Sequence, residues 1–410
     1  MDVCITPSRL SGSVTPPPSK SQAHRLLLCA ALAQGVSTIS HVVLSQDIQA
    51  TLQCMKALGA SWVREGSALR ITGIGGRAAR LERLPRMDCG ESGSTLRFLI
   101  PIALATAGGG VFTGQGRLMD RPQGPYFDLF RAKGITFSRE GNTLTVQGQL
   151  TPGEYRLPGN VSSQFFTGLL FALPLLDGKS TIVSTTAVES RDYINMTLDA
   201  LAGAGVTVEE LASPTTAFSI SPGTYRPLEQ AVEADWSQAA FWYAAAFLDN
   251  AVTPLGLSPT STQGDRVIAS LYWTLARPGD TEIDVSGCPD LLPPLAVMAA
   301  VRQGVTRFTG AARLRLKESD RLETTAALLT ALGGRAETGE DSLTVSGGAL
   351  TGGTVDGAND HRIVMAAAVA ATACSGPVVI RGAEAVGKSY PSFWADYEAL
   401  GGRIQWKEES

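Results

Sequence analysis

The chain has 410 residues, of which 44% are hydrophobic and 18% are charged, and its formal net charge is -4. A domain usually takes about 100 to 200 residues, so this length predicts two large domains, and the composition excludes a disordered or low-complexity chain. Because the chain lacks the basic surplus of nucleic-acid binders, we expect no nucleic-acid partner. Any polyanionic ligand must then be held by a local group of cations.

The cysteines and apolar stretches give no sign of a metal site or a membrane segment. The six cysteines are scattered, without a CxxC pair or histidines at zinc-ligand spacing, which predicts no metal and a reduced, cytoplasmic location. The N-terminal "MDVCITPSRL" has none of the features of a targeting peptide. The longest apolar stretch, "FFTGLLFALPLL", is too short to cross a membrane and contains Gly168 and Pro174. We expect it to be a buried helix.

A repeated phrase dominates the order of predicted elements. "MKALGASWVREGSALRITG" reads as a helix end, a C-capping Gly59, an alternating strand, a turn and a second alternating strand. The phrase recurs at Gly134, Gly205, Gly279, Gly333 and Gly401, more weakly at Gly279 and truncated at Gly401. The spacing of roughly 70 residues exceeds that of solenoid repeats, so each unit is a small α/β module.

The segments between these phrases complete the modules and the domains. Each contains an apolar helix, a short strand and a second helix, so a module reads β-α-β-α-β-β. Three modules make a domain of about 200 residues, and a composition shift near "YRPLEQAVEADWSQAA" marks a crossover between halves. The predicted domains are residues 18–232 and residues 1–17 with 233–410.

Cations stand at the starts of several apolar helices. Serine, threonine, asparagine or aspartate opens nearly every one, which ordinary N-capping explains. The helix dipole disfavours cations there, so their recurrence implies a shared benefit, namely a polyanionic ligand. The cations in or beside these first turns are Lys20, Arg25, Lys317, Arg321 and Arg362.

Two carboxylates at the same helix starts are candidates for acid–base chemistry. Asp290 in "CPDLLPPLAVMAAV" directly precedes an apolar helix, and Glu318 in "LKESDR" lies between Lys317 and Arg321. Either could instead be a plain capping residue. The protonation of Glu318 depends on whether the neighbouring cations or burial dominates.

The segment "GAEAVGKS", residues 382–389, matches the phosphate-binding loop of nucleotide hydrolases. However, only 21 residues follow Ser389, too few for the strands and the aspartate that normally come after such a loop. Pro391 also falls where the following helix should already have begun. We keep this as an alternative of a different class, in which Lys388 still binds an anion.

Six motifs, in order, resemble those of the 5-enolpyruvylshikimate-3-phosphate (EPSP) synthase family. They are "PSKSQAHR", the "RPQG" of residues 121–124, "GNVSSQF", "KESDR", "NDHR" and "GKSYPSF". The resemblance runs from residue 16 to about 400 and implies an inside-out α/β barrel of two domains, each with three β-α-β-α-β-β modules. It also implies an active site in the cleft between the domains.

The resemblance further implies a reaction and its residues. The enolpyruvyl group of phosphoenolpyruvate would pass to the 5-hydroxyl of shikimate 3-phosphate, through a tetrahedral intermediate that loses phosphate. Asp290 would accept the hydroxyl proton, Glu318 would protonate the methylene carbon and Lys20 would contact both substrates. The residues implied for shikimate 3-phosphate are Lys20, Ser21, Arg25, Ser162, Ser163, Gln164, Tyr193, Asp290 and Lys317. Those implied for phosphoenolpyruvate are Lys20, Gly93, Arg121, Gln164, Arg321, Arg362 and Lys388.

The chain departs from the family pattern at three positions. Arg313 stands where members often have asparagine, which puts a substrate contact in doubt, and Glu91 and Phe98 replace asparagine and proline. The latter two flank the region that binds glyphosate in relatives, so sensitivity to that inhibitor is not predicted.

Other functions fit less well. The sister transferase that acts on UDP-N-acetylglucosamine carries a loop cysteine that "GGGVFTGQGRLMDRP" lacks. A silent binding protein on the same fold would have lost an acid, a base or a cation, yet all are present. The resemblance implies no cofactor, no metal and a monomer.

Overall fold

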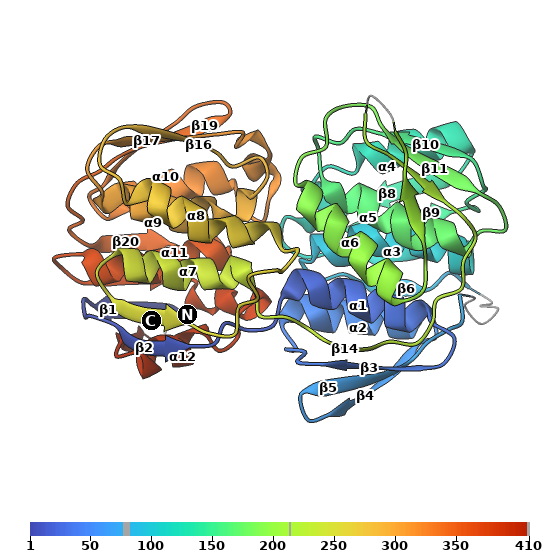
Figure 1. Cartoon of the computed structure of the whole chain (residues 1–410), viewed down its shortest axis with the longest axis horizontal. Coiled ribbons are helices and arrows are strands. Elements are labelled where there is room, and N and C mark those ends of the chain that lie inside the picture. The colour runs from blue at the N-terminus through green and yellow to red at the C-terminus, as the bar shows by residue number, and fades with distance from the viewer. Residues whose placement is uncertain (77–82, 213–214, 408–410) are drawn as a thin grey trace. The chain divides into compact units, whose positions relative to one another are not determined.

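The computed structural model describes residues 1–76, 83–212 and 215–407 of the chain. It divides into two compact units, one of Pro18–Glu233 and one of Met1–Pro17 with Ala234–Ser410. We call them the 18–233 unit and the 234–410 unit, and Figure 1 shows both. In each, helices occupy the interior and strands lie at the periphery.

The 18–233 unit contains three four-stranded sheets among its described residues. The first, in the order β14-β3-β5-β4, lies outside α1 and α2 (Figure 1). Its elements are α1 (Lys20–Leu32), β3 (Val36–Ser40), α2 (Gln46–Ala57), β4 (Ser61–Glu65), β5 (Ala68–Thr72) and β14 (Glu229–Ala231). The second module has β6 (Arg86–Asp88), α3 (Gly93–Ala107), β7 (Gly109–Thr113), α4 (Gly124–Lys133), β8 (Thr136–Glu140) and β9 (Thr143–Gln147). The third has β10 (Glu154–Leu157), α5 (Ser163–Ala172), β11 (Ser180–Ser184), α6 (Arg191–Gly203), β12 (Val208–Glu210) and β13 (Ala217–Ile220).

The 234–410 unit repeats this design with two four-stranded sheets and one of two strands in its described part. Its first module holds β2 (Ser11–Val14), α7 (Trp236–Phe247), β15 (Ala251–Pro254) and α8 (Ile268–Leu275). Its second holds β16 (Thr281–Asp284), α9 (Leu292–Val301), β17 (Val305–Thr309), α10 (Arg321–Ala331), β18 (Arg335–Thr338) and β19 (Ser342–Ser346). Its third holds β20 (Gly353–Asp356), α11 (His361–Ala370), β21 (Val378–Arg381), α12 (Phe393–Ala399), β22 (Arg403–Lys407) and the N-terminal β1 (Asp2–Thr6).

Sheet topology is the same in all five four-stranded sheets. The first two strands of each sheet, such as β16 and β17, pair in parallel, and the second pairs antiparallel with the third. In four sheets the third and fourth strands form a hairpin, as β19 and β18 do, and in the fifth they are the N-terminal β1 and the C-terminal β22. Residues buried at alternate positions, such as Leu343 and Val345 of β19, give these strands one face on the core. The predicted α/β class and the β-α-β-α-β-β module are confirmed.

The weakest of the repeated phrases is also the incomplete module. After α8 and Gly279 only one strand, β16, follows, and it joins the next sheet, so β15 pairs with β2 alone. No hairpin follows α8, and Trp273 on this helix is 68% exposed. The expected pair of strands at Gly279 is therefore reduced to one.

The repeated glycines are explained by their backbone conformation. Gly59 and Gly333 have φ of 104° and 83°, a region that residues with a Cβ rarely adopt. All six glycines of the phrase have positive φ: Gly59, Gly134, Gly205, Gly279, Gly333 and Gly401. Five of them lie within two residues of the end of a helix and turn the chain into the following strand, whereas Gly279 lies four residues after α8 ends at Leu275.

Each unit has its own apolar core. In the 18–233 unit the core includes Leu27, Leu99 and Phe166, and the stretch predicted to be a buried helix is α5, with Phe165 to Ala172 all buried. In the 234–410 unit it includes Phe241 and Leu295. Among the described residues, no helix combines the length and apolar character that crossing a membrane needs.

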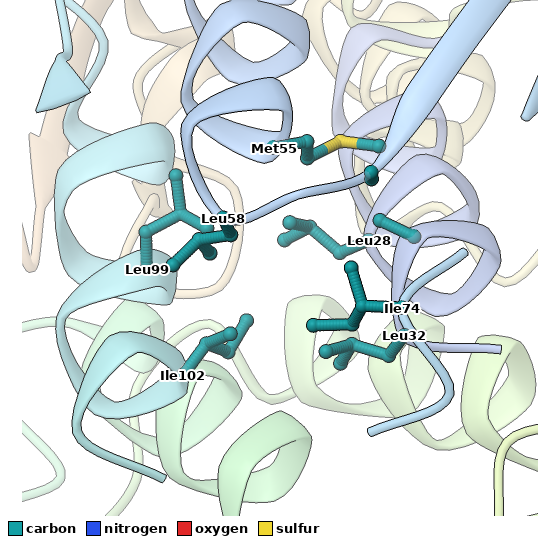
Figure 2. A pocket seen from close by; sticks show the side chains of 9 residues that line it. Leu28, Leu32, Met55, Leu58, Ile74, Leu99 and Ile102 are labelled. Carbon is teal, nitrogen blue, oxygen red and sulfur yellow. The ribbon is translucent and has the colours of Figure 1, made fainter. Parts of the chain in front are cut away.

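Between α1, α2 and α3 the packing leaves a small cavity of about 10 Å³. Figure 2 shows its apolar lining, with Leu28 and Leu32 from α1, Met55 from α2, and Leu99 and Ile102 from α3. A site with no polar partners does not hold water stably, so this is a dry packing gap. It marks the apolar face along which the three helices meet.

Candidate active site

Short polar side chains cap the helices that carry the predicted site residues. Ser19 accepts a hydrogen bond from the backbone N–H of Gln22 at the start of α1, and Ser92 accepts one from Thr95 at the start of α3. Ser162, Asp320 and Asp360 do the same for α5, α10 and α11. The cations at these helix starts are therefore additional to capping.

In the 18–233 unit Lys20 is the first residue of α1 and forms an ion pair with Asp47 of α2. The Lys20 Nζ lies 2.7 Å from Asp47 Oδ2, and both side chains are largely buried. This pair holds the lysine at the start of the helix. Asp47 was not predicted from the sequence.

Arg25 is buried and anchors α1 to α6. Its Nε donates to Thr197 Oγ1 at 2.9 Å, and its Nη2 donates to the carbonyl of Tyr193 at 2.8 Å. A third bond runs from Nη1 to the carbonyl of Ser21. Burial lowers the pKa of Arg25 to about 10, which leaves it charged at neutral pH. The structure thus brings together Ser21, Arg25 and Tyr193, and their predicted role in binding shikimate 3-phosphate stays a prediction.

Arg97, which sequence reasoning missed, links the predicted Gln164 to the backbone of the segment that carries Arg121. It is 4% exposed, and its Nη1 donates to Gln164 Oε1 at 2.8 Å, while its Nη2 donates to the carbonyl of Pro122, which follows Arg121. Gln164 in turn donates to Ser94 Oγ at 3.1 Å. The only available signal was a basic residue inside the apolar helix "STLRFLIP".

Gly93 lies directly beside the guanidinium of Arg121, and its lack of a side chain leaves room there. A Cβ added at Gly93 would lie 2.7 Å from Arg121 Nη1, closer than real contacts allow. Arg121 is 8% exposed, so its guanidinium lies in a confined space beside the start of α3. Ser162 and Ser163 lie at the start of α5, where Ser162 is the cap and Ser163 is buried.

The 234–410 unit contains a web of charges around Arg321, the first residue of α10. Its guanidinium donates to Asp290 Oδ1 at 2.7 Å, to Glu318 Oε2 at 2.7 Å and to both oxygens of Asp360 at 2.9 and 3.2 Å. Arg321 and Asp360 are fully buried. The structure therefore brings the predicted base and acid, Asp290 and Glu318, to one arginine.

Asp290 is held by three cations. Besides Arg321, Lys317 Nζ lies 3.3 Å from Oδ1, and Arg362 Nη2 lies 3.1 Å from Oδ2. Burial alone would raise the pKa of Asp290, but Arg362, Lys317 and Arg321 outweigh it and hold the pKa well below its usual range. Asp290 lies in a short 3-10 turn before α9 and makes no side-chain cap, so capping does not account for it.

Asp360 and Asp265 are two further carboxylates that the sequence reasoning missed. Asp360 caps α11 and accepts from Ser319 Oγ at 2.9 Å, and Arg321 outweighs burial to lower its pKa. Asp265 is 3% exposed; burial, followed by the charge of Asp290, raises its pKa to about 6. Within the described residues no group of histidine, cysteine and carboxylate side chains is arranged to hold a metal ion.

Lys388 lies in the segment that resembles a phosphate-binding loop, but that segment has another shape. Residues Ala383–Lys388 form a 3-10 helix, and the next helix begins only at Phe393. Lys388 is 4% exposed and donates to the carbonyl of Asn359 at 2.6 Å, just before α11. This structure lacks the helix start that a phosphate-binding loop requires.

Glu91 and Arg313, the departures from the family pattern, also have defined surroundings. The Glu91 carboxylate lies against Gly116, where an added Cβ would be 2.5 Å from Oε2. Arg313 Nη2 donates to the carbonyl of Ser286 at 2.7 Å.

Comparisons with known proteins agree with the motifs. The family model described as EPSP synthase (3-phosphoshikimate 1-carboxyvinyltransferase) matches residues 5–397. Relatives named 3-phosphoshikimate 1-carboxyvinyltransferase include one from Clostridium kluyveri, 43% identical, and one from Clostridium acetobutylicum, 42% identical; each alignment covers 98% of both chains.

Solved structures share the fold. An EPSP synthase from Acinetobacter baumannii matches with a TM-score of 0.79 at 24% identity, covering 99% of this chain and 100% of that one. An enolpyruvyl transferase from Streptomyces tendae matches with a TM-score of 0.75 at 18% identity, over 98% of both chains. From the family model and the curated relatives, the chain belongs to the EPSP synthase (3-phosphoshikimate 1-carboxyvinyltransferase) family.

Proposed function

We propose that this chain transfers the enolpyruvyl group of phosphoenolpyruvate to the 5-hydroxyl of shikimate 3-phosphate, releasing phosphate in aromatic amino-acid biosynthesis. The observation that carries the proposal is the clamp on Asp290 by Lys317, Arg321 and Arg362, with Glu318 on the same arginine. The substrates carry phosphates and carboxylates, and fixed cations can offset the repulsion between them. Family membership supplies the substrates.

In the 234–410 unit we assign the acid–base chemistry. Asp290 takes the proton of the 5-hydroxyl, whose oxygen bonds to C2 of phosphoenolpyruvate, while Glu318 gives a proton to C3. The resulting tetrahedral adduct then loses phosphate and one methyl proton, which restores the carbon–carbon double bond. Arg321, Arg362 and Lys388 bind phosphoenolpyruvate, and Lys317 binds shikimate 3-phosphate.

The charge web suggests how Asp290 becomes a useful base. A carboxylate held by three cations binds a proton weakly, since its pKa lies well below the usual range. An anionic substrate that takes over contacts of Arg321 and Arg362 would withdraw those cations from Asp290 and raise its proton affinity. Binding of phosphoenolpyruvate would thus activate the base once the donor of the enolpyruvyl group is in place.

In the 18–233 unit we assign substrate binding. Ser21, Arg25, Ser162, Ser163, Gln164 and Tyr193 bind shikimate 3-phosphate, and Gly93, Arg121 and Gln164 contact phosphoenolpyruvate. Lys20 contacts both substrates. Arg97 fixes Gln164 and the backbone beside Arg121 by the hydrogen bonds described above. We further infer a monomer in the cytoplasm, as the family resemblance implies; light scattering that gives twice the mass of one chain would contradict the monomer.

The test is phosphate release by the purified chain. We expect phosphate only when shikimate 3-phosphate and phosphoenolpyruvate are both present, in equal amount to the enolpyruvyl product. Phosphate released from ATP without these substrates would instead support the phosphate-binding-loop alternative. Release from phosphoenolpyruvate alone would make the chain a phosphatase and contradict the transfer.

A further inference from the structure

The interface of α1, α2 and α3 has a polar layer next to its apolar one. Leu28, Met55 and Leu99 line the apolar cavity of Figure 2. One helical turn earlier on each helix, at the i-4 positions, stand His24, Thr51 and Thr95, which lie on the same helix faces. Apolar residues would fill this layer without a need for hydrogen bonds, so its polar side chains require a reason.

These residues form a continuous hydrogen-bonded chain that ends at Ser92. His24 Nδ1 lies 2.8 Å from Thr51 Oγ1, and Thr51 Oγ1 lies 2.6 Å from Thr95 Oγ1. Thr95 Oγ1 donates to Ser92 Oγ at 2.7 Å. All four side chains are at most 1% exposed. We call this set, His24, Thr51, Thr95 and Ser92, the relay.

The contacts fix the direction of every proton in the relay. Because the Thr95 hydroxyl donates to Ser92, its oxygen must accept from Thr51. Thr51 then has no proton left for His24, so His24 must donate from Nδ1. Burial and the charges of Lys20 and Arg25 lower the pKa of His24 well below its usual value, so the ring is neutral and carries this single proton.

Ser92 is the end of the relay at the start of α3. Its oxygen accepts from both the backbone N–H and the hydroxyl of Thr95, at 3.1 and 2.7 Å. Its own proton is therefore not used within the relay and can be donated to a group outside it. Ser92 is followed by Gly93, whose Cα faces the Arg121 guanidinium.

We propose that His24 is a positioning residue for phosphoenolpyruvate, acting through Thr51 and Thr95 to keep the Ser92 hydroxyl as a proton donor beside Gly93 and Arg121. The inference rests on the proposed function, which assigns Gly93 and Arg121 to this substrate. The relay also ties the second turn of α1, which begins at Lys20, to the first turn of α3, which begins at Gly93. A neutral histidine with a fixed tautomer sets a proton direction that an apolar side chain cannot.

The test is steady-state kinetics of Thr51→Val, which keeps the shape of Thr51 and removes its hydroxyl. We expect the KM for phosphoenolpyruvate to rise about 10-fold, the effect of one lost hydrogen bond, with the KM for shikimate 3-phosphate changed by less than about twofold. Thr51→Ser restores the hydroxyl and should restore the KM. Thr106→Val is the matched control, since Thr106 on α3 bonds only the carbonyl of Ile102 and lies outside the relay.

A double-mutant cycle separates the relay from simple packing. If Thr51 acts through Ser92, then Thr51→Val combined with Ser92→Ala should raise the KM for phosphoenolpyruvate no more than Ser92→Ala does alone. Additive effects of the two substitutions would overturn the inference. Should Thr51→Val fail to fold, His24→Leu and His24→Asn provide the same comparison, because only asparagine can donate a hydrogen bond to Thr51.

Arg121→Gln distinguishes failure of this inference from failure of the proposed function. An unchanged KM for phosphoenolpyruvate in Thr51→Val, with a raised KM in Arg121→Gln, would overturn the relay and leave the function standing. An unchanged KM in both would remove Gly93 and Arg121 from the phosphoenolpyruvate site, and the relay would fall with them.

Discussion

Arg321 Nη1 lies 2.7 Å from Asp290 Oδ1, and this contact joins an arginine that is 1% exposed to the carboxylate proposed as the base. The same guanidinium reaches Glu318, so one buried cation fixes the positions of both proposed proton-transfer groups. A cation with this position can orient the two carboxylates without solvent screening. The placement of both carboxylates then depends on Arg321.

Glu318→Gln and Asp290→Asn should each lower kcat by about 10² to 10⁴, the usual contribution of a positioned acid or base. The KM values should change much less, because the amides keep the shape of the carboxylates. Glu323→Gln is the control: Glu323 lies in the first turn of α10, shortly after Glu318, is exposed, and its side chain pairs with Arg315 and Thr338. A kcat near that of the unsubstituted chain in either variant would remove that residue from proton transfer.

Asp360→Asn should destabilise the 234–410 unit by about 3 to 5 kcal/mol. Asp360 accepts from Arg321, Ser319 and the backbone N–H of Arg362, and an amide would turn one of its oxygens into a donor facing these donors. Urea unfolding provides the measurement. Glu282→Gln is the control. It removes the charge from the exposed partner of Arg307 and should change the free energy of unfolding by less than about 1 kcal/mol. Equal effects of the two substitutions would refute the structural role of Asp360.

Much of this site was predictable because its residues belong to local motifs. Lys317, Glu318 and Arg321 lie within five residues of each other, and Lys20 and Arg25 share one helix. Cations at helix starts go against the dipole preference, and that conflict indicated an anion site. The repeated glycines gave the modules because each requires positive φ.

The missed residues depend on contacts between distant segments. Asp47 meets Lys20 across 27 positions, and Gln164 meets Arg97 across 67. Asp360 resembled an ordinary helix cap, and its contact with Arg321 spans 39 positions. The weak phrase at Gly279 also concealed the loss of a hairpin, because the strand that follows it pairs with the next module.

Asp265→Asn should change how stability depends on pH. The pKa of Asp265 is about 6 in the folded chain, against 3.8 for the ordinary group, because of burial first and Asp290 second. The folded state therefore binds this proton more tightly, and the stability that it contributes below pH 3.8 is lost as pH rises through 6. Asparagine cannot ionise, so the variant should not show this loss. We expect the free energy of unfolding of the variant, relative to that of the unsubstituted chain, to be about 1 to 3 kcal/mol higher at pH 7 than at pH 4.

Urea unfolding of both chains at pH 4, 5, 6 and 7 is the measurement. Asp290 and Asp360 do not obscure the effect, because folding lowers their pKa values instead of raising them. The stability that these two carboxylates contribute is lost as pH falls toward their lowered pKa values, which is the opposite direction from the loss at Asp265. Parallel pH profiles for the variant and the unsubstituted chain would contradict the raised pKa of Asp265.

Gly93→Ala should weaken phosphoenolpyruvate binding more than shikimate 3-phosphate binding. The added Cβ would meet Arg121 Nη1 at 2.7 Å, and the arginine can move only by shifting a long side chain that is itself 8% exposed. We expect the KM for phosphoenolpyruvate to rise about 10-fold or more, a loss of roughly 1.4 kcal/mol. The fold should persist because the contact is with the end of a flexible side chain. Gly348→Ala is the matched control, since an added Cβ there meets nothing within 4 Å. Equal KM values for phosphoenolpyruvate in the two variants would mean that the space between Gly93 and Arg121 plays no part in binding that substrate.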